Sequence, residues 1–137
     1  MGLKWALLFI GLLALGGCRL VFPPPEVQRG EQLYRQSCQS CHGDRSGAGR
    51  LPYAPPHNEQ GHTWHHSDGN LIALILDGSG PMGEMMRQMQ GVPADAPRMP
   101  AFRGILTEDD ARAILAYLKT WWTPEQRRFQ ERTPMMP

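Results

Sequence analysis

A short cysteine–histidine motif constrains the fold of this chain more than any other feature of its sequence. Cys38 and Cys41 are separated by two residues, and His42 follows directly. This is the spacing of covalent haem attachment, because two intervening residues let both sulfurs reach one porphyrin edge and add across the vinyl groups. The adjacent imidazole can then turn under the ring to bind the iron. We therefore expect one covalently bound haem c, attached through Cys38 and Cys41, with His42 as the proximal iron ligand.

Three other interpretations of the motif are open at this point. A zinc site needs two more cysteine or histidine ligands at compatible spacing. A thioredoxin-like redox motif needs a strand–helix–strand context. A plain disulfide between the two cysteines gives no role to His42. Covalent haem is the interpretation that uses all three side chains.

The N-terminus predicts export from the cytoplasm. Residues 1–17 have the features of a signal peptide, with a charged Lys4, an unbroken apolar run over 5–15 and a small-residue cleavage site. The apolar run is short of the roughly 20 residues that a transmembrane helix needs. Residues 15–18, Leu-Gly-Gly-Cys, resemble the lipobox of bacterial lipoproteins, in which the cysteine becomes the lipid-modified first residue. The alternatives are an ordinary leader with an incidental Cys18 and an uncleaved anchor, and all three place the protein outside the cytoplasm.

The segment after the leader is expected to act as a tether. Residues 18–25 end in three consecutive prolines, and polyproline II extends by about 3.1 Å per residue, which holds the folded part within roughly 20 Å of the bilayer. The lipoprotein resemblance implies several acyl chains on Cys18, enough for stable anchoring. We expect a protein that is lipid-anchored to a bacterial membrane and faces the periplasm or the cell exterior.

The rest of the chain has room for one small domain. We assign it to residues 26–123, followed by a C-terminal tail over 124–137. Glycine and proline, at 15 and 13 of 137 residues, exceed their average shares of roughly 7% and 5%, which indicates long loops. The 14 basic residues exceed the 13 acidic ones by one, and removal of Lys4 with the leader leaves a net charge of zero. We expect no nucleic acid partner, because no basic field exists to hold one.

Three segments predict helices, and no segment has a strand pattern of comparable quality. The first spans residues 26–38, and the second runs from residue 67 or 68 to residue 77. The third begins at Thr107, which has the capping-box spacing to Asp110, and is stopped by Pro124. We therefore expect an all-α fold, with three or more helices and long Gly/Pro-rich loops packed around one haem.

The first helix and the motif together resemble the class I c-type cytochromes, a family that includes small monohaem proteins of bacteria. In that family an N-terminal helix ends at the attachment motif and crosses a C-terminal helix closely, with a glycine and an aromatic residue at the positions of Gly30 and Tyr34. The resemblance implies the cytochrome c fold for residues 26–123. We expect Leu115 or Leu118 of the last helix to meet the face of Gly30 and Tyr34.

The same resemblance implies a supporting acceptor for the proximal histidine. In these cytochromes a proline carbonyl in the loop after the motif accepts the Nδ1 proton of the axial histidine and orients its ring. Pro52, Pro55 and Pro56 all fall in that loop. We select Pro55 as the acceptor.

The distal iron ligand is expected to be Met99. Pro97 and Pro100 flank it, and proline restricts the preceding residue to extended conformations, so a stiff loop can present the thioether. From Met99 to Phe102 the sequence also resembles the family's Met-Pro-x-Phe ligand motif. A methionine ligand raises the reduction potential of a haem. Met82 is the second choice for this position.

Two clusters depart from the family pattern. The first is a set of methionines with the spacing of one helical face: Met82, Met85, Met86 and Met89. Such thioethers can pack near a haem edge or bind copper(I). The second is a set of loop histidines: His57, His62, His65 and His66. These side chains can be exposed or hydrogen-bonded, replace the distal methionine, bind copper or, like Trp64, contact the haem propionates.

The resemblance implies a membrane-tethered monohaem cytochrome c that carries single electrons between exported or membrane-bound redox partner proteins. Saturated axial coordination leaves the iron no open position, so we expect an electron carrier and not an enzyme. As a separate expectation, the protein is a monomer. Two alternatives stay open. One is a copper-handling or redox-sensing haem protein that uses the methionine and histidine clusters. The other is a catalytic cytochrome with a labile distal ligand that acts on small molecules.

Overall fold

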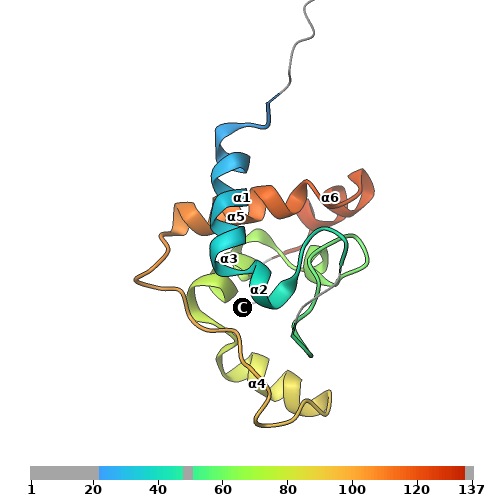
Figure 1. Cartoon of the computed structure of the whole chain (residues 1–137). Helices are drawn as coiled ribbons and strands as arrows, with labels where there is room; N and C mark the ends of the chain where they lie inside the picture. Colours follow the sequence, from blue (N-terminus) through green and yellow to red (C-terminus); the bar gives the residue numbers. More distant parts are fainter. Residues whose placement is uncertain (1–21, 48–50, 135–137) are drawn as a thin grey trace, which may run out of the picture.

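Helices make up the regular structure of the chain (Figure 1). The computed structural model describes residues 22–47 and 51–134, so the predicted signal peptide, Cys18 and the start of the tether lie outside the described residues. The elements are, in order, α1 (Pro25–Ser37), α2 (Gln39–His42), the 3₁₀ helix η1 (Thr63–His65), α3 (Asp68–Asp77), α4 (Gly80–Met89), α5 (Glu108–Lys119) and α6 (Pro124–Glu131). Over these two ranges no strand forms beyond an isolated bridge between Arg103 and Leu106. The all-α fold class is confirmed.

Within the same two ranges, none of the helices combines the length and the apolar character that a bilayer crossing requires.

The crossing of α1 and α5 is the main helix contact of the fold (Figure 1). At Gly30 a Cβ atom would lie 1.9 Å from the carbonyl oxygen of Ala113 and 3.0 Å from Cβ of Tyr117. Only glycine permits such a close approach of two helix backbones. The residues nearest Gly30 are therefore Ala113 and Tyr117, four residues apart on one face of α5, and not Leu115 or Leu118 as we expected.

An aromatic cluster continues this contact toward the end of α1. Tyr34 is 1% exposed, and its ring lies 5.8 Å from that of Tyr117 and 5.2 Å from that of Trp121, measured between centroids. Its hydroxyl donates to the carbonyl oxygen of Gly43 at 2.9 Å. Tyr34 thus links the helix crossing to the turn that follows the cysteine motif.

Helix α3 packs on α5 and completes the core. Ser67 caps its first turn by accepting from the backbone N–H of Asn70, and Gly78 ends it with a φ of 72°. The two helices contribute to the core cluster Leu71, Ile72, Ile75 and Leu76 of α3 and Ala111, Ile114, Leu115 and Leu118 of α5. Cys38 belongs to the same cluster, so the motif is built into the core.

The predicted capping box at the start of α5 is present. Thr107 accepts from the backbone N–H of Asp110, and the Asp110 carboxylate accepts from the backbone N–H of Thr107. Arg29 of α1 also donates to this carboxylate, at 2.9 Å. The start of α5 is therefore fastened to α1 as well as capped.

Besides the short elements α2 and η1, the structure has two longer helices, α4 and α6, outside the three segments predicted to be helical. Helix α4 extends away from the α1–α5 pair (Figure 1), and no other helix makes extensive contact with it. Helix α6 lies in the region assigned to the C-terminal tail. Pro124 stops α5 but suits the first position of a new helix, and Thr123 caps it with Gln126. Gln130 is 2% exposed and donates to the carbonyl oxygen of His66, which fixes α6 against η1.

Candidate haem site

The cysteine motif forms the joint between α1 and α2. Cys38 follows the last residue of α1 and is buried, whereas Cys41 lies within α2 and is partly exposed. Both are free thiols. Gly43 then turns the chain with a φ of 77°, a conformation that favours glycine. The two thiols and His42 are consequently held together on one short, sharply bounded segment.

His42 is buried, and its ring has a defined hydrogen-bonding direction. Nδ1 lies 2.8 Å from the carbonyl oxygen of Pro55. A carbonyl oxygen can only accept, so Nδ1 carries the proton and Nε2 presents a lone pair. Burial lowers the pKa of His42, although the bond to Pro55 opposes this shift. The arrangement keeps a neutral imidazole with Nε2 available to a metal. The bond is the contact that the family resemblance implies for Pro55.

The loop that carries Met99 is fastened to the end of α3. The backbone N–H of Arg103 donates to the carbonyl oxygen of Leu76 at 2.8 Å. A Cβ on Gly78 would lie 2.9 Å from the Met99 carbonyl oxygen, so the loop and the helix end are in close contact. The Met99 side chain is half-buried and packs against the core cluster that contains Cys38.

The methionines of α4 have a different environment. Met85, Met86 and Met89 are 56%, 47% and 76% exposed. The side chain of Met82 lies outside what the structure describes. Of the methionines whose side chains are described, Met99 is the one that packs against the core. This favours it as a ligand and leaves the α4 methionines on the surface.

The loop histidines separate into two groups. His57 lies against His42, with ring centroids 4.2 Å apart and planes at 29°. Two imidazoles that bind one iron from opposite sides point their nitrogens at each other, so this face-to-face stack excludes His57 as the distal partner of His42. Burial and the adjacent His42 lower the pKa of His57 to about 3, and the ring is neutral at neutral pH. Sequence analysis missed this contact, although His57 stands only two residues after Pro55.

The second histidine group gathers around η1. The rings of His62 and His65 stack at 4.6 Å, and His66 lies edge-on to His62 at 5.1 Å. Helix η1 packs on α6, and α6 and α4 lie at opposite ends of the molecule (Figure 1). The histidine and methionine clusters therefore do not form a common copper site.

Neither zinc nor thiol–disulfide chemistry gains support from the structure. Across 22–47 and 51–134, no three side chains of His, Cys, Asp and Glu are grouped so that they could hold a metal ion. Burial raises the pKa of the Cys38 thiol to about 11, with a further contribution from Cys41. Reactive thiols of disulfide oxidoreductases have lowered pKa values, because the thiolate is the nucleophile. Cys38 has the opposite property.

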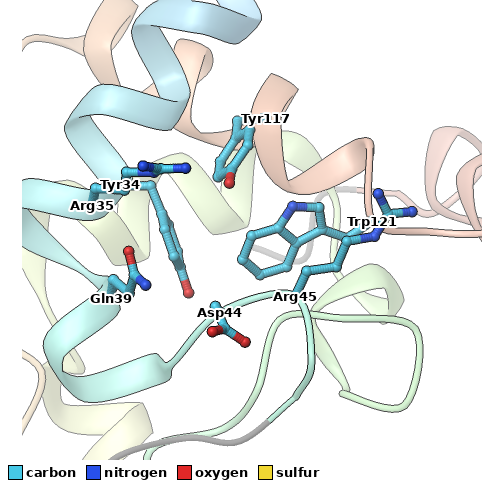
Figure 2. A pocket seen from close by; sticks show the side chains of 7 residues that line it. All are labelled: Tyr34, Arg35, Gln39, Asp44, Arg45, Tyr117 and Trp121. Atoms are coloured by element: carbon cyan, nitrogen blue, oxygen red, sulfur yellow. The ribbon is translucent and has the colours of Figure 1, made fainter.

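A solvent-open pocket of about 360 Å³ lies beside the motif (Figure 2). Tyr34, Tyr117 and Trp121 form an aromatic wall, and the other lining side chains are those of Arg35, Gln39, Asp44 and Arg45. None of the three motif side chains lines this pocket. It is therefore distinct from the position at which the motif would hold a haem.

Comparison with known proteins decides the family. A family described as cytochrome C oxidase, cbb3-type, subunit III, matches residues 25–118, which is more than half of the chain. The chain belongs to the c-type cytochromes. This cytochrome is also similar to cytochrome c55X of Paracoccus denitrificans (strain Pd 1222), with 35% identity over 111 residues, 78% of this chain and 87% of the relative. No solved structure gives a significant match.

As a c-type cytochrome, the protein is an electron-transfer haem protein and carries covalently bound haem c. The residues present fit that group. Cys38 and Cys41 are not joined in a disulfide, so both sulfurs could form thioethers, and the only ring nitrogen of His42 without a proton is Nε2. The indole N–H of Trp64 is buried and has no hydrogen-bond partner in the described part of the chain. Such a donor needs an acceptor, and the propionates of a haem are acceptors. Domains of this family generally lie outside the cytoplasm.

Proposed function

We propose that this cytochrome is a membrane-tethered monohaem electron carrier whose iron is bound by His42 and Met99. The bond between His42 Nδ1 and Pro55 carries the proposal, because it commits one nitrogen to a structural role and leaves the other as a ligand. The half-buried thioether of Met99, on a loop fastened to α3, supports the distal assignment.

The haem supplies a one-electron couple at its iron. The residues of the chain would attach it and orient its ligand. Cys38 and Cys41 would form the thioethers, Pro55 would orient His42, and apolar residues of α3 and α5 share the buried cluster with Cys38. Met99 supplies a soft ligand that raises the potential. With His42 and Met99 both bound to it, the haem would exchange an electron and would not bind a substrate.

The optical spectrum of the purified mature protein tests this ligation. The oxidised form should show the weak near-infrared band of sulfur-to-iron charge transfer. The reduced form should not bind carbon monoxide rapidly or stoichiometrically. Absence of the band together with rapid carbon monoxide binding would show an open distal position and favour the catalytic alternative.

The proposal also includes the site of action. A lipidated Cys18 and the following proline-rich tether place the domain near a bacterial membrane, facing the periplasm or the cell exterior. Its partners are then redox proteins that are exported or membrane-bound and lie within reach of a short tether. No nucleic acid partner is proposed, and the carrier acts as a monomer.

Copper titration of the mature holoprotein separates this function from copper handling. A plain electron carrier should bind no stoichiometric copper(I) or copper(II). The separation of the histidine and methionine clusters in the fold supports that expectation. Stoichiometric, tight copper binding would favour the metal-handling alternative.

A further inference from the structure

The ring of His57 covers one face of the His42 imidazole. Their centroids are 4.2 Å apart and their planes differ by 29°. His57 follows Pro55, the acceptor of the His42 Nδ1 proton, by two residues. One short segment therefore supplies both a hydrogen bond to the edge of the His42 ring and a second ring against its face.

The position of His57 is itself well determined. Its Nδ1 lies 2.7 Å from Oγ1 of Thr63, a residue that is 8% exposed. Its carbonyl oxygen accepts from Nε1 of Trp122 at 2.8 Å. Its ring also meets Tyr34 edge-on, at a centroid distance of 6.1 Å. Contacts from three parts of the chain hold both the backbone and the ring of this residue.

These contacts add to the restraint that the Pro55 bond provides. The hydrogen bond from Nδ1 holds one edge of the His42 ring, and both faces of the ring would tilt if the imidazole turned about its iron bond. A rigid ring stacked on one face opposes that rotation, because turning the imidazole would break the stack or produce a clash.

We propose that His57 is a positioning residue that sets the rotational orientation of the His42 imidazole about its iron bond. The inference rests on the proposed ligation of the iron by His42. In a ferric haem, the plane of an axial imidazole determines which iron d orbital holds the unpaired electron. That orbital determines how spin density is shared among the pyrrole rings. His57 thereby sets the electronic asymmetry of the haem without touching the iron.

The test is proton NMR of the ferric holoprotein as its cyanide adduct. Cyanide replaces the distal ligand with a cylindrically symmetric one, so the order of the haem-methyl shifts then reports the plane of the proximal imidazole. His57→Leu removes the flat ring, His57→Phe keeps one, and His62→Leu is the matched control at an exposed loop histidine. We expect a changed order or a reduced spread of methyl shifts in His57→Leu, and the wild-type order in His57→Phe and His62→Leu.

Thr63→Val provides a second, milder variant in case His57→Leu does not incorporate haem. It removes the hydroxyl that holds His57 but leaves both imidazole rings in the chain. We expect a smaller displacement of the methyl shifts in the same direction as in His57→Leu.

Two failures can be distinguished. If the wild-type adduct lacks the hyperfine-shifted ring protons of a bound His42, the proposed ligation is wrong. If those signals are present but the methyl pattern of His57→Leu, or of Thr63→Val where that variant replaces it, equals that of the wild type, the ligation stands and the positioning role of His57 is overturned.

Discussion

Each ring nitrogen of His42 has its own task. Nδ1 is committed to the Pro55 carbonyl, and Nε2 keeps a lone pair in a buried site where the neutral imidazole is favoured. The proposal for Met99 rests on a similar observation, because its thioether is half-buried while Met85, Met86 and Met89 of α4 are exposed. For single residues, the chemistry depends on which nitrogen or sulfur atoms have no other bonding partner and can bind a metal.

Replacement of Met99 by alanine should leave the covalent haem in place and change its redox properties. We expect a lower reduction potential, loss of the near-infrared band and carbon monoxide binding in the ferrous form, because the distal position opens. Potentiometry and optical titration measure these effects. Met89→Ala is the matched control, since Met89 is 76% exposed, and it should behave like the wild type. An unchanged potential in Met99→Ala would contradict the ligand assignment.

The helices differ in how their positions are determined. Helices α1 and α5 are locked at Gly30 and joined by the bond from Arg29 to Asp110. Among the helices that the structure describes, none packs on α4 to a comparable extent, and α4 exposes Met85, Met86 and Met89. A substitution in the α1–α5 crossing should therefore cost far more stability than a similar one in α4.

Gly30→Ala tests the closeness of the crossing. A Cβ at this position would lie 1.9 Å from the Ala113 carbonyl oxygen, so the backbones must separate. We expect a loss of about 3 kcal/mol in the free energy of unfolding, measured by denaturant titration of the ferric holoprotein. Gly83→Ala in α4 meets only the Ser79 side chain, at 3.1 Å, and should be near neutral or stabilising by up to about 1 kcal/mol. If Gly30→Ala and Gly83→Ala changed the free energy of unfolding equally, the close contact of α1 and α5 at Gly30 would be contradicted.

Asp110 makes the α1–α5 junction sensitive to acid. The backbone N–H of Thr107, its hydroxyl and Arg29 lower the pKa of Asp110 to about 2, from 3.8 in the unfolded chain. A depressed pKa contributes stability at pH values above about 4, and that contribution is lost as the pH falls from about 4 to about 2. Asp110→Asn should lose about 1 kcal/mol at pH 7. Its stability should fall less than that of the wild type over this acid window. If the free energy of unfolding of the two proteins changed equally with pH, Asp110 would not be the source of the acid sensitivity.

For the whole molecule, we expect haem attachment and folding to be coupled. The domain is small, and Cys38 lies in its hydrophobic core, so the haem supplies part of the buried surface. A ligand that binds only the folded state stabilises it, and a covalent one cannot dissociate. The proposed membrane tether belongs to the same scale, because it would determine which partners the whole domain can reach.

A Cys38→Ala/Cys41→Ala double variant should lack covalent haem and be poorly folded. We expect a lower helical circular dichroism signal and a broad or absent thermal transition. The matched comparison is the wild-type holoprotein under the same conditions. If the haem-free variant unfolded cooperatively at the wild-type temperature, the protein core would be sufficient for folding without haem.

Cys18→Ser tests the proposed lipid anchor. The wild type should be recovered with membranes, and the variant should lose this association while its haem spectrum stays unchanged. Fractionation followed by haem staining measures both properties. Membrane association that persists in the variant would favour an uncleaved anchor.

The sequence alone determined the features that depend on local spacing. The Cys38–His42 motif predicted haem c, and the α5 capping box followed from the separation of Thr107 and Asp110. The all-α class followed from helical patterns, since capping and periodicity act over a few residues. The choice of Pro55 came from a family resemblance and not from spacing.

Only the tertiary structure decided which distant residues meet. The family resemblance led us to expect Leu115 or Leu118 against the face of Gly30 and Tyr34, whereas the packed helices bring Ala113 and Tyr117 to Gly30. The sequence also provided no reason to separate His57 from the other loop histidines, but in the folded loop its ring stacks on that of His42. Local patterns state what a segment can form, but the rotation and closeness of packed segments depend on every contact in the core at once.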